Sequence, residues 1–358
     1  MYEQRIKTVR RNLANRGLEQ MLVCDPRSIH YLTGAFIEPG ERFLGLIVGS
    51  DARPTLVLNA LFAAPADAAC TVRSFTDTDD PLAIVEGLCD ADKPLGCDKN
   101  LPARFLLPLM ERGAASGFVL ASDAVDDARA IKDDTERELM RAASAANDAA
   151  MDRFRRLVHE GVTEADVAGQ LEAIYRELGA QGHSFTPSSA SARTRPIRTT
   201  SPTTRRWPAA DVVLFDVGCR KGEYCSDMTR TFVFGEPSEK LREVHDTVRR
   251  ANEAARKLVA PGVRFCDIDA AARSIIEEAG YGSYFTHRLG HQIGLDVHEP
   301  GDVSAAHDAP VQAGMVFSIE PGIYLPGEFG VRIEDLVLVT EDGCEVLNSY
   351  PRELVSIG

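Results

Sequence analysis

Residues 131–358 of this 358-residue chain contain an internal repeat, and this repeat limits the possible folds more than any other feature. Residues 146–150 (ANDAA) resemble residues 251–255 (ANEAA). In both copies the expected helix is followed by a Gly-Val loop, a second helix and a strand. Such a repeat predicts a duplicated unit that folds about a pseudo-twofold axis, with a site at the centre lined by both halves. The alternative is a chance similarity between two alanine-rich helices.

The first part of the chain has a different pattern, in which short apolar runs alternate with helical periodicity. The expected elements are a helix at residues 2–16 and strands at residues 20–24, 43–48 and 55–58. This alternation predicts a compact α/β domain over residues 1–130. The polar stretch 126–134 is the expected linker. Residues 131–358 form the second domain, whose first helix is expected to begin at a capping box of Thr135 and Glu138.

Charge and composition exclude several classes of partner. The net charge of −14 argues against binding to nucleic acid or to an anionic membrane. The eight cysteines are dispersed and form no CxxC pair, which is typical of reduced thiols. The N-terminus lacks the continuous apolar segment of a secretory signal, and no stretch approaches the length of a membrane span. We therefore expect a cytoplasmic protein.

The candidate functional site begins with an acid-bearing hairpin. One expected strand, residues 212–218, carries Asp216, and the next, residues 225–232, carries Asp227. A two-residue loop at Lys221–Gly222 lies near the midpoint between them, so a tight hairpin is expected. In that register Asp216 lies directly opposite Asp227, with their Cβ atoms ~5 Å apart on one face of the sheet.

A second hairpin repeats this arrangement. Two expected strands flank a stretch rich in glycine and proline: residues 315–320 and 331–339 around residues 321–330. The midpoint between Glu320 and Glu334 is Gly327. A second antiparallel pair again brings two carboxylates together.

Four clustered carboxylates need cations or shared protons, because like charges facing each other in a sheet are destabilising. Two divalent ions balance four carboxylates charge for charge. Oxygen ligands with one imidazole suit Mn²⁺, Co²⁺ or Zn²⁺, in two-metal sites with ions ~3.5–4 Å apart. Any one of these acids alone is consistent with a solvated residue at a strand end, but two acid-bearing hairpins together favour a metal site.

The candidate imidazole ligands lie in residues 285–299, where His287, His291 and His298 are interleaved with glycine. Such a cluster is unusual in a plain strand. Isolated histidines elsewhere are interpreted as ordinary core or surface residues: His30, His159, His183, His245 and His307.

The order of these motifs resembles that of the creatinase/aminopeptidase-P family, the pita-bread metallopeptidases of family M24. The motifs are Asp216, residues 224–231, His287, residues 290–291, residues 298–299, residues 320–324 and residues 330–335. The resemblance covers the whole of the second domain, and the first domain is of the expected kind. It implies an α/β N-terminal domain followed by an α+β pita-bread domain with pseudo-twofold symmetry, whose curved antiparallel sheet is backed by helices.

The resemblance also implies a set of metal ligands. Five side chains would bind two divalent ions, with Mn²⁺ or Co²⁺ the most expected and Zn²⁺ also suitable: Asp216, Asp227, His291, Glu320 and Glu334. Asp227 and Glu334 would bridge the ions, and a metal-bridging hydroxide would be the nucleophile. Glu320 would also transfer the proton, first as general base and then as general acid.

The same resemblance assigns roles to three further residues. His298 would stabilise the tetrahedral intermediate, as donors in an oxyanion hole do. His287 and Arg332 would line the substrate pocket, with Arg332 suited to binding a carboxylate or to ordering the bridging Glu334.

One segment, residues 188–200, departs from the family pattern. The family's Asn and Pro-His positions hold Thr194 and Thr199 here, and a mixture of Ser, Thr, Arg and Pro makes a poor central strand. Codons can be chosen for this segment that restore the family motif when they are read one base earlier. We hypothesise a one-base deletion near Ser188 and a compensating insertion near Ser201. The DNA sequence of the gene tests this, and the alternative is a divergent loop.

Two smaller departures are Gln292 and Glu223, each in place of a common glycine. Gln292 is expected to alter the shape of the pocket rather than metal binding.

The implied function is hydrolysis of Xaa-Pro dipeptides or short proline-containing peptides by a homodimer. One alternative is an aminopeptidase P or a non-peptide C–N hydrolase on the same scaffold, acting on a substrate such as creatine or an ectoine derivative. Retention of all five ligands disfavours a creatinase, which lacks the metals. The other alternative is an inactive metal-binding relative, because the Pro-His segment is rewritten.

Overall fold

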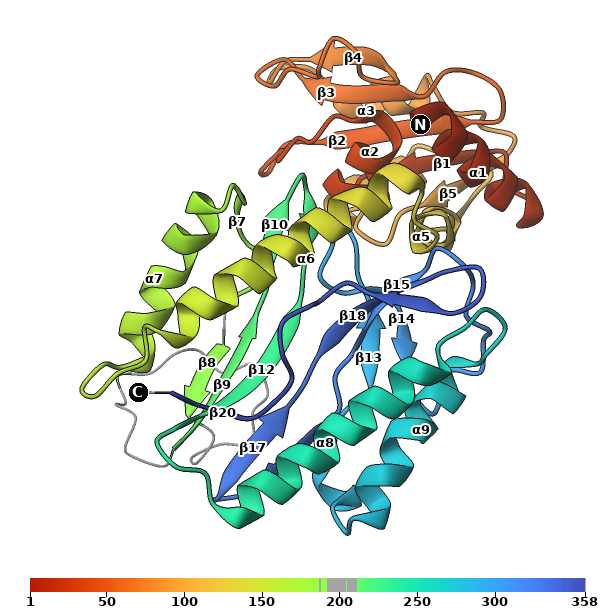
Figure 1. Ribbon diagram of the computed structural model, residues 1–358. Coiled ribbons are helices and arrows are strands. Elements are labelled where there is room, and N and C mark those ends of the chain that lie inside the picture. Colours follow the sequence, from red (N-terminus) through yellow and green to blue (C-terminus); the bar gives the residue numbers. More distant parts are fainter. Residues whose placement is uncertain (187, 192–203, 205–210, 358) are drawn as a thin grey trace. The chain divides into compact units, whose positions relative to one another are not determined.

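The computed structural model describes residues 1–186, 188–191, 204 and 211–357, and it divides the chain into two compact units, Met1–Arg129 and Ala130–Gly358 (Figure 1). Among the helices of the described residues, none combines the length and the low charge that a membrane span requires.

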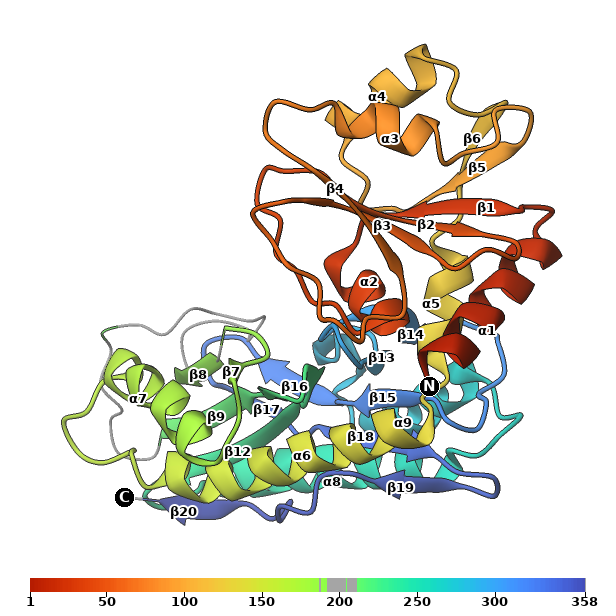
Figure 2. The ribbon, with the colours of Figure 1, turned by 90° about the horizontal axis from the view of Figure 1, so that it is seen from above.

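The first unit is built on a six-stranded mixed sheet with the order β4-β3-β2-β1-β5-β6. Its strands are β1 (Gln20–Val23), β2 (Leu44–Gly49), β3 (Thr55–Asn59), β4 (Thr71–Phe75), β5 (Pro94–Cys97) and β6 (Gly117–Leu120). Its helices are α1 (Tyr2–Asn15), α2 (Pro26–Thr33), α3 (Pro81–Glu86), α4 (Ala103–Glu111) and α5 (Asp123–Ala130). Figure 2 shows α3 and α4 on one face of the sheet and α1, α2 and α5 on the other. The expected helix and three strands of this unit are confirmed.

In its described residues, the second unit contains two helix pairs and four small sheets. The helices are α6 (Asp134–Arg155), α7 (Glu164–Glu177), α8 (Glu239–Leu258) and α9 (Phe265–Glu278), with the short 3₁₀ helix η1 (Gly282–Tyr284). The strands of the first half are β7 (Gly182–His183), β8 (Ser188–Ser191), β9 (Asp211–Val217), β10 (Cys219–Lys221), β11 (Tyr224–Cys225) and β12 (Met228–Phe234). Those of the second half are β13 (Gly290–Gln292), β14 (Glu299–Val303), β15 (Val316–Ile319), β16 (Gly322–Leu325), β17 (Phe329–Arg332), β18 (Asp335–Val339), β19 (Cys344–Val346) and β20 (Val355–Ile357).

The two helix pairs cover corresponding strands of the two halves. The apolar side chains of α6 and α7 pack against β9 and β12, and those of α8 and α9 pack against β15 and β18. The main sheets have the orders β20-β12-β9-β8 and β14-β13-β15-β18-β19. This is the α+β arrangement that the internal repeat predicts.

Equivalent asparagines show how closely the two halves correspond. Asn147 on α6 donates through Nδ2 to the carbonyl oxygen of Val217 at 2.9 Å, and Asn252 on α8 donates to that of Ile319 at 2.9 Å. Both side chains are fully buried, and each bonds the backbone beside an acid of the predicted site. The repeat is therefore structural, and the alternative of a chance similarity is wrong.

The expected linker at residues 126–134 and the expected capping box of Thr135 and Glu138 are wrong in detail. Most of the stretch expected to be a linker is helical, because α5 continues to Ala130. The capping box of α6 is formed by Asp133 and Glu136, two residues before the predicted pair. Asp133 accepts from the Glu136 N–H, and Glu136 accepts from the Asp133 N–H. An aspartate at the N-cap satisfies these free N–H groups as well as a threonine does.

The segment that departs from the family pattern is described only in part. Ser188–Ser191 form the edge strand β8, which pairs with β9. Residues 192–200, including Thr194 and Thr199, lie outside the described residues.

Candidate metal centre

The first acid-bearing hairpin has a different register from the predicted one. Asp216 on β9 lies opposite Thr229 on β12, so it is not directly opposite Asp227. The turn is formed by Gly222 and Glu223, because the pairing of Lys221 with Tyr224 encloses these two residues. Both have left-handed backbone angles, φ +58° and +70°, as a type I′ hairpin turn requires.

This two-residue shift does not separate the two acids. Side chains alternate between the faces of a strand with a period of two, so a shift by two residues leaves each acid on its predicted face. Asp216 and Asp227 accordingly line the same cavity.

The second hairpin has the predicted register, with its centre at Gly327. The pairs Ile319–Asp335 and Gly322–Arg332 enclose Glu320 and Glu334 on the two strands. The stretch expected to be a loop is instead largely paired as β16 and β17, with Gly327 at φ +77° at the tip. The hairpin thus holds two acids across from each other at the junctions between its strands.

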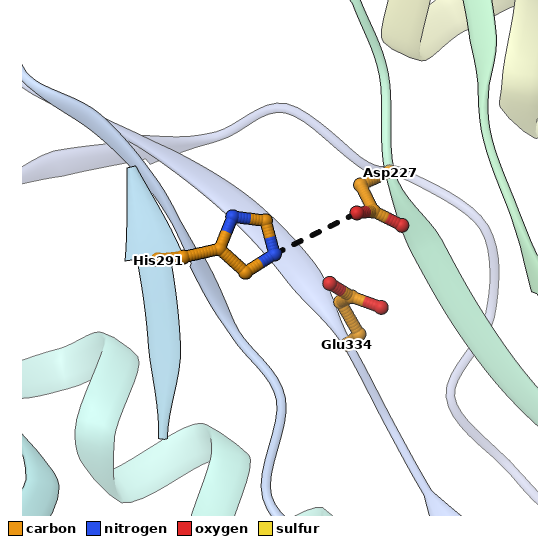
Figure 3. Close-up of side chains that lie close together, drawn as sticks. All are labelled: Asp227, His291 and Glu334. Atoms are coloured by element: carbon orange, nitrogen blue, oxygen red, sulfur yellow. Dashed lines mark ion pairs between the residues drawn. The ribbon is translucent and has the colours of Figure 1, made fainter. Parts of the chain in front are cut away.

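His291 on β13 points at these acids. Its Nε2 atom lies 3.8 Å from Asp227 Oδ2 and 3.5 Å from Glu320 Oε1. Figure 3 shows the side chains of Asp227, His291 and Glu334 pointing toward one another, and one ligand atom from each lies within 4.8 Å of the others. Burial lowers the pKa of His291 to about 3, so the ring is neutral at physiological pH and able to bind a metal ion.

All eight predicted site residues line one cavity of about 490 Å³. They are Asp216, Asp227, His287, His291, His298, Glu320, Arg332 and Glu334. Three further residues complete the lining and were missed from the sequence: Phe185, Arg288 and Val297. Arg288 and Val297 lie inside the histidine-rich segment, but nothing in the pattern indicated which of its other side chains face the cavity.

Burial favours the protonated forms of the acids in the cavity. Burial raises the pKa of Asp227 well above its ordinary value, and the nearby carboxylates of Glu334 and Asp216 raise it further. Burial and the charge of Glu320 likewise raise the pKa of Glu334 well above its ordinary value. Burial raises the pKa of Glu320 to about 7, although the charge of Arg332 opposes this rise. Cations in the cavity would reverse these shifts.

Arg332 organises two of the acids. It forms an ion pair with Asp216 through Nη2 and donates through Nε to Thr229 Oγ1 at 3.0 Å. The Thr229 hydroxyl in turn donates to Glu334 Oε2 at 2.6 Å. Arg332 therefore reaches Glu334 through Thr229, a residue that the sequence did not single out.

His287 and His298 occupy different environments in the cavity. His287 Nε2 lies 3.0 Å from the hydroxyl of Tyr324, which also accepts from Arg332 Nη1 at 3.0 Å. His298 is exposed, and its ring meets the His291 ring edge-to-face with centroids 4.3 Å apart. Gln292 lies outside the cavity lining, since its buried amide packs against the α-carbon of Gly301 on β14.

The residues of the cavity fit divalent metal ions. The Oδ1 atom of Asp227 is buried and has no hydrogen-bond partner among the described residues. Such an atom is costly unless it meets a ligand or a cation. Carboxylate and imidazole donors at this spacing are the ligand types that Mn²⁺, Co²⁺ and Zn²⁺ accept.

The cavity gathers four acids, three histidines and two arginines, a set of side chains that suits a metal-dependent hydrolase. Residues 138–341 match the model of metallopeptidase family M24, and residues 5–131 match the creatinase/prolidase N-terminal domain. The chain belongs to metallopeptidase family M24. The resemblance stated from the motifs and the predicted fold class are both confirmed.

Named relatives extend over the whole chain. A putative dipeptidase of Bacillus subtilis, YkvY, is 35% identical over 98% of this chain and 99% of its own length. The crystal structure of dipeptidase PepE from Mycobacterium ulcerans is 34% identical, with a TM-score of 0.92 over 99% of this chain and 98% of that one. The prolidase of Pyrococcus horikoshii is 30% identical, with a TM-score of 0.91 over 98% of this chain and 99% of that one.

Proposed function

We propose that this metallopeptidase hydrolyses Xaa-Pro dipeptides or short proline-containing peptides with two divalent ions. The observation that carries the proposal is that all eight predicted site residues line one cavity. The naming of similar proteins as dipeptidases and prolidases agrees with a small peptide substrate. A cavity of about 490 Å³ has the size of a site for a small molecule.

The ions would be held by Asp216, Asp227, His291, Glu320 and Glu334. When bound, divalent ions supply Lewis-acid polarisation of the scissile carbonyl group and an activated water molecule. Asp227, His291 and Glu334 would be able to hold the same ion, because one ligand atom of each lies within 4.8 Å of the others.

Glu320 is the proposed proton carrier. Its carboxylate lines the cavity and would accept a proton from the attacking water and later donate it to the leaving amine. The Ser318 hydroxyl donates to Glu320 Oε1 at 3.1 Å and holds the carboxyl group in place. His298 is exposed in the same cavity and would donate to the oxygen that becomes negative in the transition state.

His287 and Arg332 are the proposed substrate-binding pair. Arg332 already holds Asp216, Thr229 and Tyr324, so its contribution to substrate binding would be electrostatic and indirect. Phe185 and Val297 supply apolar surface in the lining, which suits a proline ring.

The remaining features of this proposal stay predictions. They are the domain boundary near residue 130, Mn²⁺ or Co²⁺ as the preferred ions, a homodimer and a cytoplasmic location. Metal analysis of the purified protein would test the preferred ions, and sedimentation equilibrium would test the homodimer.

Proline release from a panel of Xaa-Pro dipeptides tests the function, with Mn²⁺ or Co²⁺ added and a chelated control. Metal-dependent release supports the proposal. No release from a protein that still binds two ions would contradict it and favour an inactive or repurposed relative. Reversion of Thr199→His with its neighbours would then test whether residues 188–200 cause the loss.

A further inference from the structure

A buried ion pair lies next to the candidate metal centre and has no role in the proposed chemistry. Lys132 donates through Nζ to Glu299 Oε2 at 2.8 Å, and the two side chains are 1% and 4% exposed. Lys132 precedes α6, whereas Glu299 begins β14 and directly follows His298. Taking two charges out of water is costly, so such a pair persists only where its geometry is well determined.

The second oxygen of Glu299 holds the loop that carries His298. Glu299 Oε1 accepts from the Leu295 N–H at 3.0 Å. Gly294 packs directly on the same carboxylate, because a Cβ atom at this position would lie 2.7 Å from Oε1 and 2.8 Å from Oε2. Residues 294–298 therefore fold around the Glu299 side chain.

The lysine end of the pair is also anchored. The Lys132 N–H donates to the Gly314 carbonyl oxygen at 2.9 Å, and the Lys132 carbonyl oxygen accepts from Arg137 Nε at 2.9 Å. The ammonium group thus approaches Glu299 from a backbone that is bonded on both sides. This makes Lys132 a rigid support for the carboxylate.

We propose that Lys132 and Glu299 are positioning residues that order residues 294–298 and place His298 in the cavity. The inference rests on the proposed function, in which His298 assists the reaction. Neither residue lines the cavity, so both act through the loop. The five proposed metal ligands lie outside this loop, so a change in the pair is expected to leave both ions bound.

A double-mutant cycle tests the role of Lys132 in turnover. Lys132→Met is expected to lower kcat on an Xaa-Pro dipeptide by about 10–10²-fold, as a small misplacement of a catalytic group does, with two ions still bound. In a His298→Ala background the same change is expected to have no further effect. If Lys132→Met lowers kcat by the same factor in the wild-type protein and in His298→Ala, the proposal is overturned, because the pair then acts independently of His298.

Nuclear magnetic resonance of His298 gives a readout that does not need turnover. With carbon-13 at histidine Cε1, His298→Ala assigns the signal in the zinc-loaded and the chelated protein. Lys132→Met is expected to broaden or shift this signal and leave that of His245 unchanged. An unchanged His298 signal would overturn the proposal even if the wild-type protein releases no proline, so failure of the function and failure of this inference are distinguishable.

Two further variants separate positioning from general stability. Lys132→Met/Glu299→Gln removes the unpaired charge and keeps an oxygen for the Leu295 N–H, so it is expected to restore much of the lost kcat. Arg129→Met is the matched control, because it breaks a buried ion pair with Asp25 in the first unit. It is expected to lower stability without changing the His298 signal, and a changed signal in this control would contradict the assignment to Lys132.

Discussion

At the scale of single residues, the site is defined by buried groups that can gain or lose a proton. Asp227 and Glu334 are 4% and 2% exposed, and burial is the largest cause of their raised pKa values. His291 differs, since burial lowers its pKa to about 3 and leaves the ring neutral. Protons therefore compete with metal ions for these carboxylates, whereas they do not compete for the histidine ring.

Metal binding near neutral pH is expected to release protons from these acids. Below their raised pKa values the metal-free carboxyl groups hold protons, so affinity should rise and proton release should fall as the pH rises from ~6 to ~8. The His291 ring is already neutral at this pH, so it releases no proton when metal binds. Titration calorimetry in buffers of different ionisation enthalpy measures the release. A binding enthalpy that is independent of the buffer would contradict this prediction.

Thr229 is expected to tune metal affinity without binding metal. Thr229→Val removes the hydroxyl group between Arg332 and Glu334, and loss of such an outer contact typically weakens metal binding by about 10–100-fold. Thr247→Val is the control, because Thr247 is also buried but bonds the Glu243 carbonyl oxygen within α8. Competition with a fluorescent chelator would compare the two, and equal affinities would refute the role of Thr229.

At the scale of elements, the first hairpin owes its register to an unusual turn. Glu223 is the one residue other than glycine with a left-handed φ among the described residues. It is held there by contacts with Gln181, which accepts from the Glu223 N–H at 3.1 Å. The departure noted in the sequence at Glu223 is thus a strained position in the hairpin that carries Asp216 and Asp227.

Glu223→Gly is expected to stabilise the protein by up to ~1 kcal/mol, because glycine adopts this conformation without strain. Loss of an exposed side-chain contact offsets part of the gain. Gly222→Ala should destabilise, since its Cβ atom would lie 2.7 Å from Leu139 Cδ2 and its φ is +58°. Urea denaturation measures both changes. A decrease in stability for Glu223→Gly would show that the contacts with Gln181 outweigh the backbone strain.

At the scale of the whole molecule, all five proposed metal ligands belong to the unit Ala130–Gly358. They come from both halves of the repeat, with Asp216 and Asp227 from the first hairpin and Glu320 and Glu334 from the second. Metal binding should therefore stabilise the two halves together.

Metal addition is expected to slow hydrogen exchange in β9, β12, β13, β15 and β18 and to leave residues 1–129 unchanged. Ligand at ~100 times Kd stabilises the state that binds it by about 2.7 kcal/mol, and chelation should remove this stabilisation. Exchange mass spectrometry with and without Mn²⁺ measures the pattern. If metal slows hydrogen exchange equally in both units, the prediction that only the second unit is stabilised is contradicted.

The sequence by itself determined the fold class and the four acids that meet in the cavity, and the resemblance of its motifs to a known family added three histidines and Arg332. Local signals sufficed for the acids, because alternation along a strand assigns each acid to a face, and the midpoint at Gly327 determines the register of the second hairpin. Only the tertiary structure decided the turn at Glu223, the partners of Arg332 and the pairing of Lys132 with Glu299. Lys132 and Glu299 lie 167 positions apart in the sequence. All three features depend on packing between segments distant in the chain, and no periodic pattern records which buried charges meet there.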